Sequence, residues 1–169
     1  DNDDEIIVLK TFKHTCKLKT QEFVVRTKTL NDIVTDVVTI GVVMSTRRLL
    51  RFQFGCIRNG KFSLCLQADG TYKLLDGGWT CIDAGTHTIG FDQGKYVHHF
   101  LPLIFCMTMS ECEKSYKIVF KTLRDVARAF GVSKSPLLVS HLSIDRTCYI
   151  ASAAVAVWPL VVILQCWPH

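Results

Sequence analysis

The chain has 169 residues, of which 49% are hydrophobic and 21% are charged, and its formal net charge at pH 7 is +5. This length allows one domain with its own core, with or without a short flanking segment, and excludes two large domains. The composition excludes a disordered tail, and so small a charge excess is compatible with a nucleic-acid partner without requiring one.

Residues 1 to 57 have the least distinct pattern in the chain. Short β-favouring runs over residues 5 to 10, 22 to 27 and 33 to 43 are separated by polar clusters. The pattern predicts a small strand-rich or mixed N-terminal flanking segment, followed by a turn over residues 58 to 61.

Basic residues cluster in this first third more than the net charge suggests. Three of them, Arg47, Arg48 and Arg51, lie close together in the sequence. Such clusters are typical of surfaces that contact DNA phosphates, and equally of a solvated basic face without a partner. Both interpretations stay open, with these three arginines as candidate DNA contacts.

A regular pattern begins at residue 62. Apolar and polar residues alternate up to Asp69, as in a half-buried strand with Asp69 at its end. Gly70 then permits a turn or bulge. Two further strands are expected over residues 79 to 89 and 97 to 108, joined by a turn-rich segment.

The clearest helix follows these strands. Ser110 and Glu113 have the spacing of a capping box at its start. Apolar residues then recur every three or four positions, so one face packs on a sheet, and Gly131 is placed to end the helix. Residues 137 to 144 predict a fourth strand, which Asp145 follows directly.

The last part of the chain is apolar and uncharged. Residues 147 to 158 predict a buried helix that Pro159 ends, and residues 160 to 164 predict a fifth strand, buried on both faces. The uncharged stretch over residues 150 to 167 is also about as long as a membrane span, which keeps a small membrane-anchored protein as an alternative. Pro159 and Gln165 argue against that alternative.

Cysteine usage bears on the cellular compartment. Eight cysteines would suggest a disulfide framework in a short secreted protein, but most lie in apolar runs and no signal peptide precedes them. We therefore interpret four of them as reduced core residues of an intracellular protein: Cys65, Cys81, Cys106 and Cys148. Both ends of the chain look cut.

Two aspartates carry the chemistry that this order of elements suggests. Asp69 and Asp145 end the first and fourth strands from residue 62, and sites in α/β sheets form at the carboxyl ends of neighbouring strands. Carboxylates there suit Mg²⁺ or Mn²⁺, which activates water and stabilises both oxygens exchanged at a phosphodiester. Each aspartate also has a structural explanation, because Asp69 precedes a glycine and Asp145 precedes a helix.

The residues around both aspartates resemble the Mutator-like element (MULE) transposase domain. Residues 66 to 74 are similar to its first catalytic block, in which an aspartate is followed by a small residue, threonine, an aromatic residue and lysine. Residues 145 to 159 are similar to its second block. Cys166 and His169 resemble its cysteine-x-x-histidine signature, and the matches together cover residues 62 to 169 in order.

The resemblance implies a ribonuclease-H-like α/β fold over residues 62 to 169, with a mixed five-stranded sheet and flanking helices. It implies that Asp69 and Asp145 are catalytic, as the first two members of an aspartate-aspartate-glutamate triad that binds Mg²⁺ or Mn²⁺. The third carboxylate would lie on a helix after the end of this C-terminally truncated chain. Lys73, in the first block, becomes a further candidate DNA contact.

Other candidate ligands are weaker. Glu111 and Glu113 lie at a helix start, where capping and the helix dipole explain them better than catalysis does. Cys166 and His169 have a spacing that suits Zn²⁺, but a closed zinc site needs four ligands, so we expect a structural motif. His141 lies on the strand face of the second aspartate, as a neighbour of the site.

We therefore expect part of a transposase catalytic domain, whose full-length relatives cut and join DNA. The chain alone is expected to be inactive, because it carries only two of the three carboxylates. Its expected partners are transposon-end DNA and further copies in a homo-oligomer, without a membrane, in a nuclear or intracellular rather than secreted protein. The alternative is a domesticated transposase-derived DNA-binding or transcription-regulating protein without catalysis.

Overall fold

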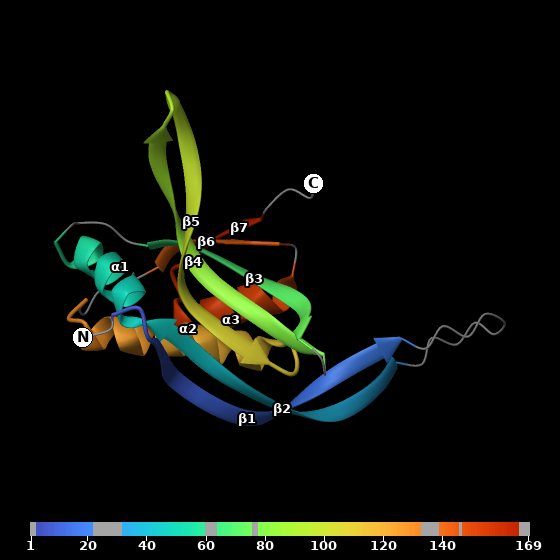
Figure 1. Cartoon of the computed structure of the whole chain (residues 1–169). Coiled ribbons are helices and arrows are strands. Elements are labelled where there is room, and N and C mark those ends of the chain that lie inside the picture. Colours follow the sequence, from blue (N-terminus) through green and yellow to red (C-terminus); the bar gives the residue numbers. More distant parts are fainter. Residues whose placement is uncertain are drawn as a thin grey trace.

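The computed structural model describes residues 3–21, 32–59, 64–75, 78–132, 139–145 and 147–165. These residues form one mixed sheet in the order β1-β2-β5-β4-β3-β6-β7, flanked by helices (Figure 1). The α/β class and the mixed sheet with flanking helices are confirmed. The elements are β1 (Ile6–Gln21), β2 (Asp32–Thr46), α1 (Arg47–Asn59), β3 (Leu64–Leu75), β4 (Trp79–Asp92), β5 (Lys95–Thr108), α2 (Glu113–Ala129), β6 (Val139–Ile144), α3 (Cys148–Val157) and β7 (Val162–Gln165).

The sheet has two strands more than the five expected, because the N-terminal hairpin joins it. β1 and β2 pair antiparallel, and β2 continues the sheet through four residue pairs with β5, from Gly41 opposite Thr108 to Met44 opposite Phe105. Helix α1 follows β2 directly, so the flanking segment is mixed in structure. The turn predicted over residues 58 to 61 is wrong at its start, because α1 continues to Asn59. The predicted run over residues 22 to 27 lies outside the described residues.

The other five strands follow the predicted order. β3, β4 and β5 form an antiparallel meander, whereas β6 pairs parallel with β3 and β7 pairs parallel with β6. Gly70 does not interrupt β3, since it pairs with Ile82 inside the ladder. β4 and β5 stay paired up to Asp92 and Lys95, so their hairpin projects beyond the other strands (Figure 1).

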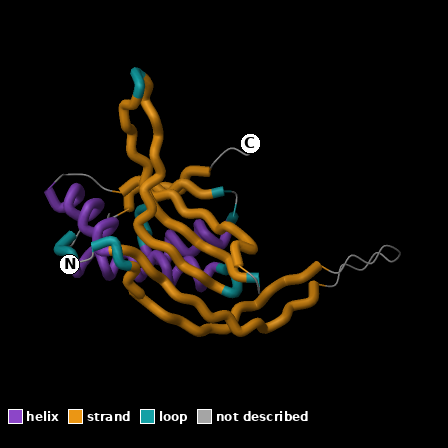
Figure 2. The backbone as a smooth tube through the Cα atoms, viewed as in Figure 1, coloured by secondary structure: helices purple, strands orange, loops and turns teal. Residues whose placement is uncertain are grey.

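Helices α2 and α3 pack together behind the strands and form the core with them (Figure 2). The aromatic ring centroids of Phe120 and Trp158 lie 5.2 Å apart, and those of Tyr116 and Tyr149 lie 5.8 Å apart. All but Tyr149 are fully buried. The helical periodicity of the sequence therefore marked the face of α2 that faces the core.

The start of α2 differs from the prediction. The N-cap residue is Cys112, whose side chain makes no capping hydrogen bond, and Glu113 is already the first helical residue. The Ser110 hydroxyl instead hydrogen-bonds the Thr39 hydroxyl at 2.6 Å, which ties the loop before α2 to β2. The predicted capping box is therefore wrong, but Gly131 does follow the helix end, with φ 74°.

Two burial predictions were also wrong. Side chains of β7 that were expected to be buried on both faces are 49% exposed at Val162 and 47% exposed at Leu164, because β7 is an edge strand. Cys65 and Cys148 are exposed rather than in the core, although both are free thiols, as are Cys81 and Cys106. In the described part of the chain, no helix is long and apolar enough to cross a membrane.

Candidate functional site

The prediction that Asp69 ends its strand is wrong, because β3 continues past it to Leu75. Asp69 and Asp145 nevertheless come to the same level of the sheet. β3 and β6 run parallel, with Gln67 opposite Ser143, and the two aspartates stand two residues beyond that pair. Adjacent strands are about 4.8 Å apart, so the two residues are neighbours across the sheet. Both are exposed, whereas the preceding Ala68 and Ile144 are buried in the core. Their carboxylates therefore face away from the core.

A third aspartate, which the sequence patterns did not single out, lies on the other side of Asp69. Asp83 of β4 is the direct cross-strand partner of Asp69 in the antiparallel ladder. Half-burial, and then the charge of Asp69, raise the pKa of Asp83 above its usual range. Two like charges directly opposite each other destabilise a sheet, so a contribution to stability does not explain why two aspartates face each other here.

The pair predicts a pH-dependent stability. Because the folded state raises the pKa of Asp83, it holds the proton to higher pH than the unfolded chain does, and the free energy of unfolding falls as pH rises from about 3.9 through the folded pKa. Asp83→Asn should therefore stabilise the protein at pH 7 by about 0.5 kcal/mol and remove this fall.

Urea unfolding from pH 3.5 to 8 measures this effect. The matched control is Asp92→Asn at the hairpin tip, where the aspartate is exposed and lies opposite Lys95 rather than a carboxylate. Asp92→Asn should not stabilise the protein. An Asp83→Asn protein with wild-type stability at every pH would show that the repulsion is absent.

Asp145 has a second role at the start of α3. Its Oδ1 accepts hydrogen bonds from the Thr147 amide at 3.1 Å and from the Thr147 hydroxyl. Oδ1 of Asp69 likewise accepts the amide of Gly70 at 2.8 Å. Among the described residues, no hydrogen-bond donor reaches Oδ2 of either aspartate. Each side chain thus uses one carboxylate oxygen to order the backbone next to it.

Glu111 lies on the core side of the same strand segment. A Cβ on Gly70 would be 2.6 Å from Glu111 Oε1, so only a glycine lets this carboxylate approach β3 so closely. The Tyr116 hydroxyl donates to Oε1 at 2.6 Å, and Oε2 is buried without a described partner. Burial and this bond raise the pKa of Tyr116, so the phenol stays protonated and keeps donating.

The predicted metal-binding cluster is incomplete in the described residues. No group of three or more histidine, cysteine, aspartate or glutamate side chains there is close enough to hold a metal ion. Asp69 and Asp145 are brought together, but His141 is not part of such a group. Cys166 and His169 lie outside the described residues, and so does the side chain of Lys73.

The arginine candidates lie elsewhere. Arg47, Arg48 and Arg51 are on the first turns of α1 and are exposed. α1 precedes β3 and lies beside the end of the sheet where β3 begins, away from the carboxyl ends of β3 and β6 (Figure 1). Any role of these arginines is therefore separate from the aspartates.

Comparison of the chain with models of protein families, with curated proteins and with solved structures finds no match.

Proposed function

We propose that the chain is part of the catalytic domain of a Mutator-like DNA transposase, in which Asp69 and Asp145 bind Mg²⁺ or Mn²⁺ for phosphodiester cleavage and strand transfer. One observation supports the proposal: the parallel register of β3 and β6 brings the exposed Asp69 within β3 to the level of the exposed Asp145, which directly follows β6. Asp145 thus stands at the carboxyl end of a strand, where α/β sheets build their sites, and the residues around both aspartates resemble the two catalytic blocks.

The two aspartates supply the oxygen ligands that a hard divalent cation prefers, but too few of them to complete a site. Each aspartate offers one carboxylate oxygen, and Mg²⁺ and Mn²⁺ prefer oxygen ligands. When bound, the metal would activate water and stabilise the entering and leaving oxygens at the phosphorus. Two carboxylates do not complete such a site, and in the proposal the third is the triad glutamate. The chain alone is therefore expected to bind the metal weakly and not to cleave DNA.

A cleavage assay tests this. The purified chain is incubated with supercoiled plasmid and end-labelled duplex in 5 mM Mn²⁺, a concentration on the order of weak carboxylate-site affinities, beside Asp69→Ala and Asp92→Asn proteins. No nicking above the level of the Asp69→Ala protein is expected. Strong Mn²⁺-dependent cleavage by the wild type and Asp92→Asn, lost in Asp69→Ala, would contradict the inactivity of the chain.

The second candidate is a transposase-derived DNA-binding protein without catalysis. The bonds from Thr147 to Asp145 favour it, because they give Asp145 a structural role in the turn before α3 that persists without a metal. In that case duplex binding should depend on salt and survive the double change Asp69→Asn, Asp145→Asn. Loss of DNA binding in that double variant, with the fold intact by circular dichroism, would exclude this candidate.

Both candidates include a nuclear location, and Cys112 offers a test of it. Cys112 is disulfide-bonded in the structure, and disulfides persist in oxidising compartments but are rare in the nucleus. A nuclear protein should carry a reduced Cys112 when thiols are alkylated in intact cells. An oxidised Cys112 under those conditions would place the protein in an oxidising compartment.

A further inference from the structure

The first turns of α1 carry positive charge at the end of the helix where it is least favoured. The turn starts with Arg47 and Arg48, Arg51 follows within one turn, and no acidic residue of the helix lies there. The helix dipole is positive at this end, so these arginines do not stabilise the helix itself. Anionic groups from outside the helix would therefore stabilise these arginines.

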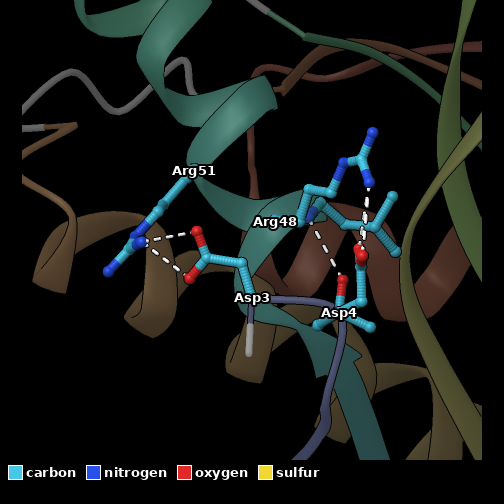
Figure 3. A network of polar contacts seen from close by, with 6 residues as sticks. Asp3, Asp4, Arg48 and Arg51 are labelled. Carbon is cyan, nitrogen blue, oxygen red and sulfur yellow. Dashed lines mark hydrogen bonds and ion pairs between the residues drawn. The ribbon is translucent and has the colours of Figure 1, made fainter. Parts of the chain in front are cut away.

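Two carboxylates from the segment before β1 supply those anions (Figure 3). Nη1 of Arg51 lies 2.7 Å from both carboxylate oxygens of Asp3, and Nη1 of Arg48 lies 3.3 Å from both oxygens of Asp4. The Arg48 amide also donates to the Asp3 carbonyl at 2.9 Å. The segment thus covers the arginines with acidic groups from more than 40 residues earlier in the chain.

These ion pairs are open to competition. The Arg48 and Asp4 side chains are 71% and 68% exposed, and those of Arg51 and Asp3 are 52% and 38% exposed. Exposed pairs are weak and are screened by salt. A polyanion that offers several charges at once can therefore displace the two aspartates.

The same surface carries an aromatic side chain. Phe52 follows Arg51, lies one helical turn after Arg48, and is 60% exposed, whereas Leu50 and Phe54 on the opposite face of α1 are buried. Exposed aromatics among cations bind nucleic-acid strands by stacking on unpaired bases while the cations hold phosphates. The three arginines and the exposed ring on one face of α1 therefore match the phosphates and the bases of a nucleic-acid single strand.

We propose that the arginine face, defined as Arg47, Arg48, Arg51 and Phe52, binds a single-stranded segment of nucleic acid, and that Asp3 and Asp4 compete for its arginines. The acidic segment then weakens non-specific binding until a nucleic acid of sufficient charge displaces it. The inference rests on the proposed function only for the class of partner and uses none of the sheet aspartates.

Fluorescence anisotropy with a labelled 20-nucleotide single strand, the matching duplex and heparin tests the proposal, with EDTA present so that no divalent metal contributes. The 20-nucleotide length is about that of a few binding sites of a single domain. Asp3→Asn, Asp4→Asn should bind the single strand about three to ten times more tightly than wild type at low salt. The control is Asp92→Asn, Asp125→Asn, which makes the same change in net charge at exposed sites elsewhere.

Changes in the face should act in the opposite direction. Arg48→Gln, Arg51→Gln should weaken single-strand binding about tenfold or more and lower the salt slope by about 1.4, as expected for two lost phosphate contacts. The matched control is Arg124→Gln, Arg128→Gln, whose arginines both pair with Asp125 on α2. Phe52→Ala should weaken binding of the single strand about fivefold or more and of duplex or heparin less.

Three outcomes would overturn the proposal. In the first, Asp3→Asn, Asp4→Asn strengthens binding no more than its charge-matched control does, and in the second, Arg48→Gln, Arg51→Gln weakens binding no more than its control does. In the third, Phe52→Ala weakens binding of the single strand, the duplex and heparin equally. The first rejects the competition, the second rejects the face, and the third rejects the stacking. Because metal is absent and none of the tested variants changes a sheet aspartate, failure here is separate from failure of the proposed metal site.

Discussion

Replacement of Trp158 by alanine should lower the free energy of unfolding by about 3 to 5 kcal/mol, the largest effect expected of a single change in this protein. Trp158 is the C-cap residue of α3, is 2% exposed, and packs its ring 5.2 Å from that of Phe120 on α2. Its removal leaves a cavity between the two helices and the sheet. Urea unfolding followed by circular dichroism measures the loss.

Trp158→Phe is the informative companion. The indole Nε1 is buried without a described hydrogen-bond partner, so the tryptophan already carries the cost of an unsatisfied donor. Phenylalanine keeps most of the ring and removes that donor, and the expected loss is below about 1.5 kcal/mol. A loss below 1 kcal/mol, roughly the scale of a surface change, in Trp158→Ala would show that α3 does not pack as described.

Tyr116→Phe should lower the free energy of unfolding by about 2 kcal/mol, because it removes the hydroxyl that donates to Glu111 beside Gly70. The remaining carboxylate would be buried with neither oxygen bonded to a described donor. Removing one partner of a buried charged hydrogen bond costs more than the bond contributes, since the other partner stays desolvated.

The control for this change is Tyr96→Phe at the projecting hairpin, where the ring is 76% exposed and the hydroxyl is accessible to water. That change should alter stability by less than about 0.5 kcal/mol. In the double variant Tyr116→Phe, Glu111→Gln, much of the loss should be recovered, because the neutral amide is less costly to bury than a carboxylate. Equal losses for Tyr116→Phe and Tyr96→Phe would refute the buried bond.

The sequence predicted the elements from residue 62 onward because each has a clear period. Alternation marked β3, a three- and four-residue repeat marked α2, and Pro159 separated α3 from β7. The position of Asp145 directly after a strand was also predicted, whereas Asp69 lies within β3, which continues to Leu75. That Asp69 and Asp145 lie at the same level depends on the parallel register of β3 and β6, which no local pattern of the sequence indicates.

Other features depend on pairing between residues far apart in the sequence, so no local sequence pattern predicts them. Asp83 lies inside a predicted strand, and only the antiparallel register sets it opposite Asp69; a shift of one residue would turn it to the other face. The join between β2 and β5 likewise has no local signal. The capping box failed because the Ser110 hydroxyl bonds Thr39, a residue 71 positions earlier.

Paramagnetic broadening by Mn²⁺ tests the central claim most directly. With the ¹⁵N-labelled chain, substoichiometric Mn²⁺ should broaden the amide signals of residues around Asp69, Asp83 and Asp145 first, and the effect should disappear in Asp69→Asn but remain in Asp92→Asn. Broadening that is strongest elsewhere, or that is the same in Asp69→Asn, would contradict a metal site at Asp69 and Asp145.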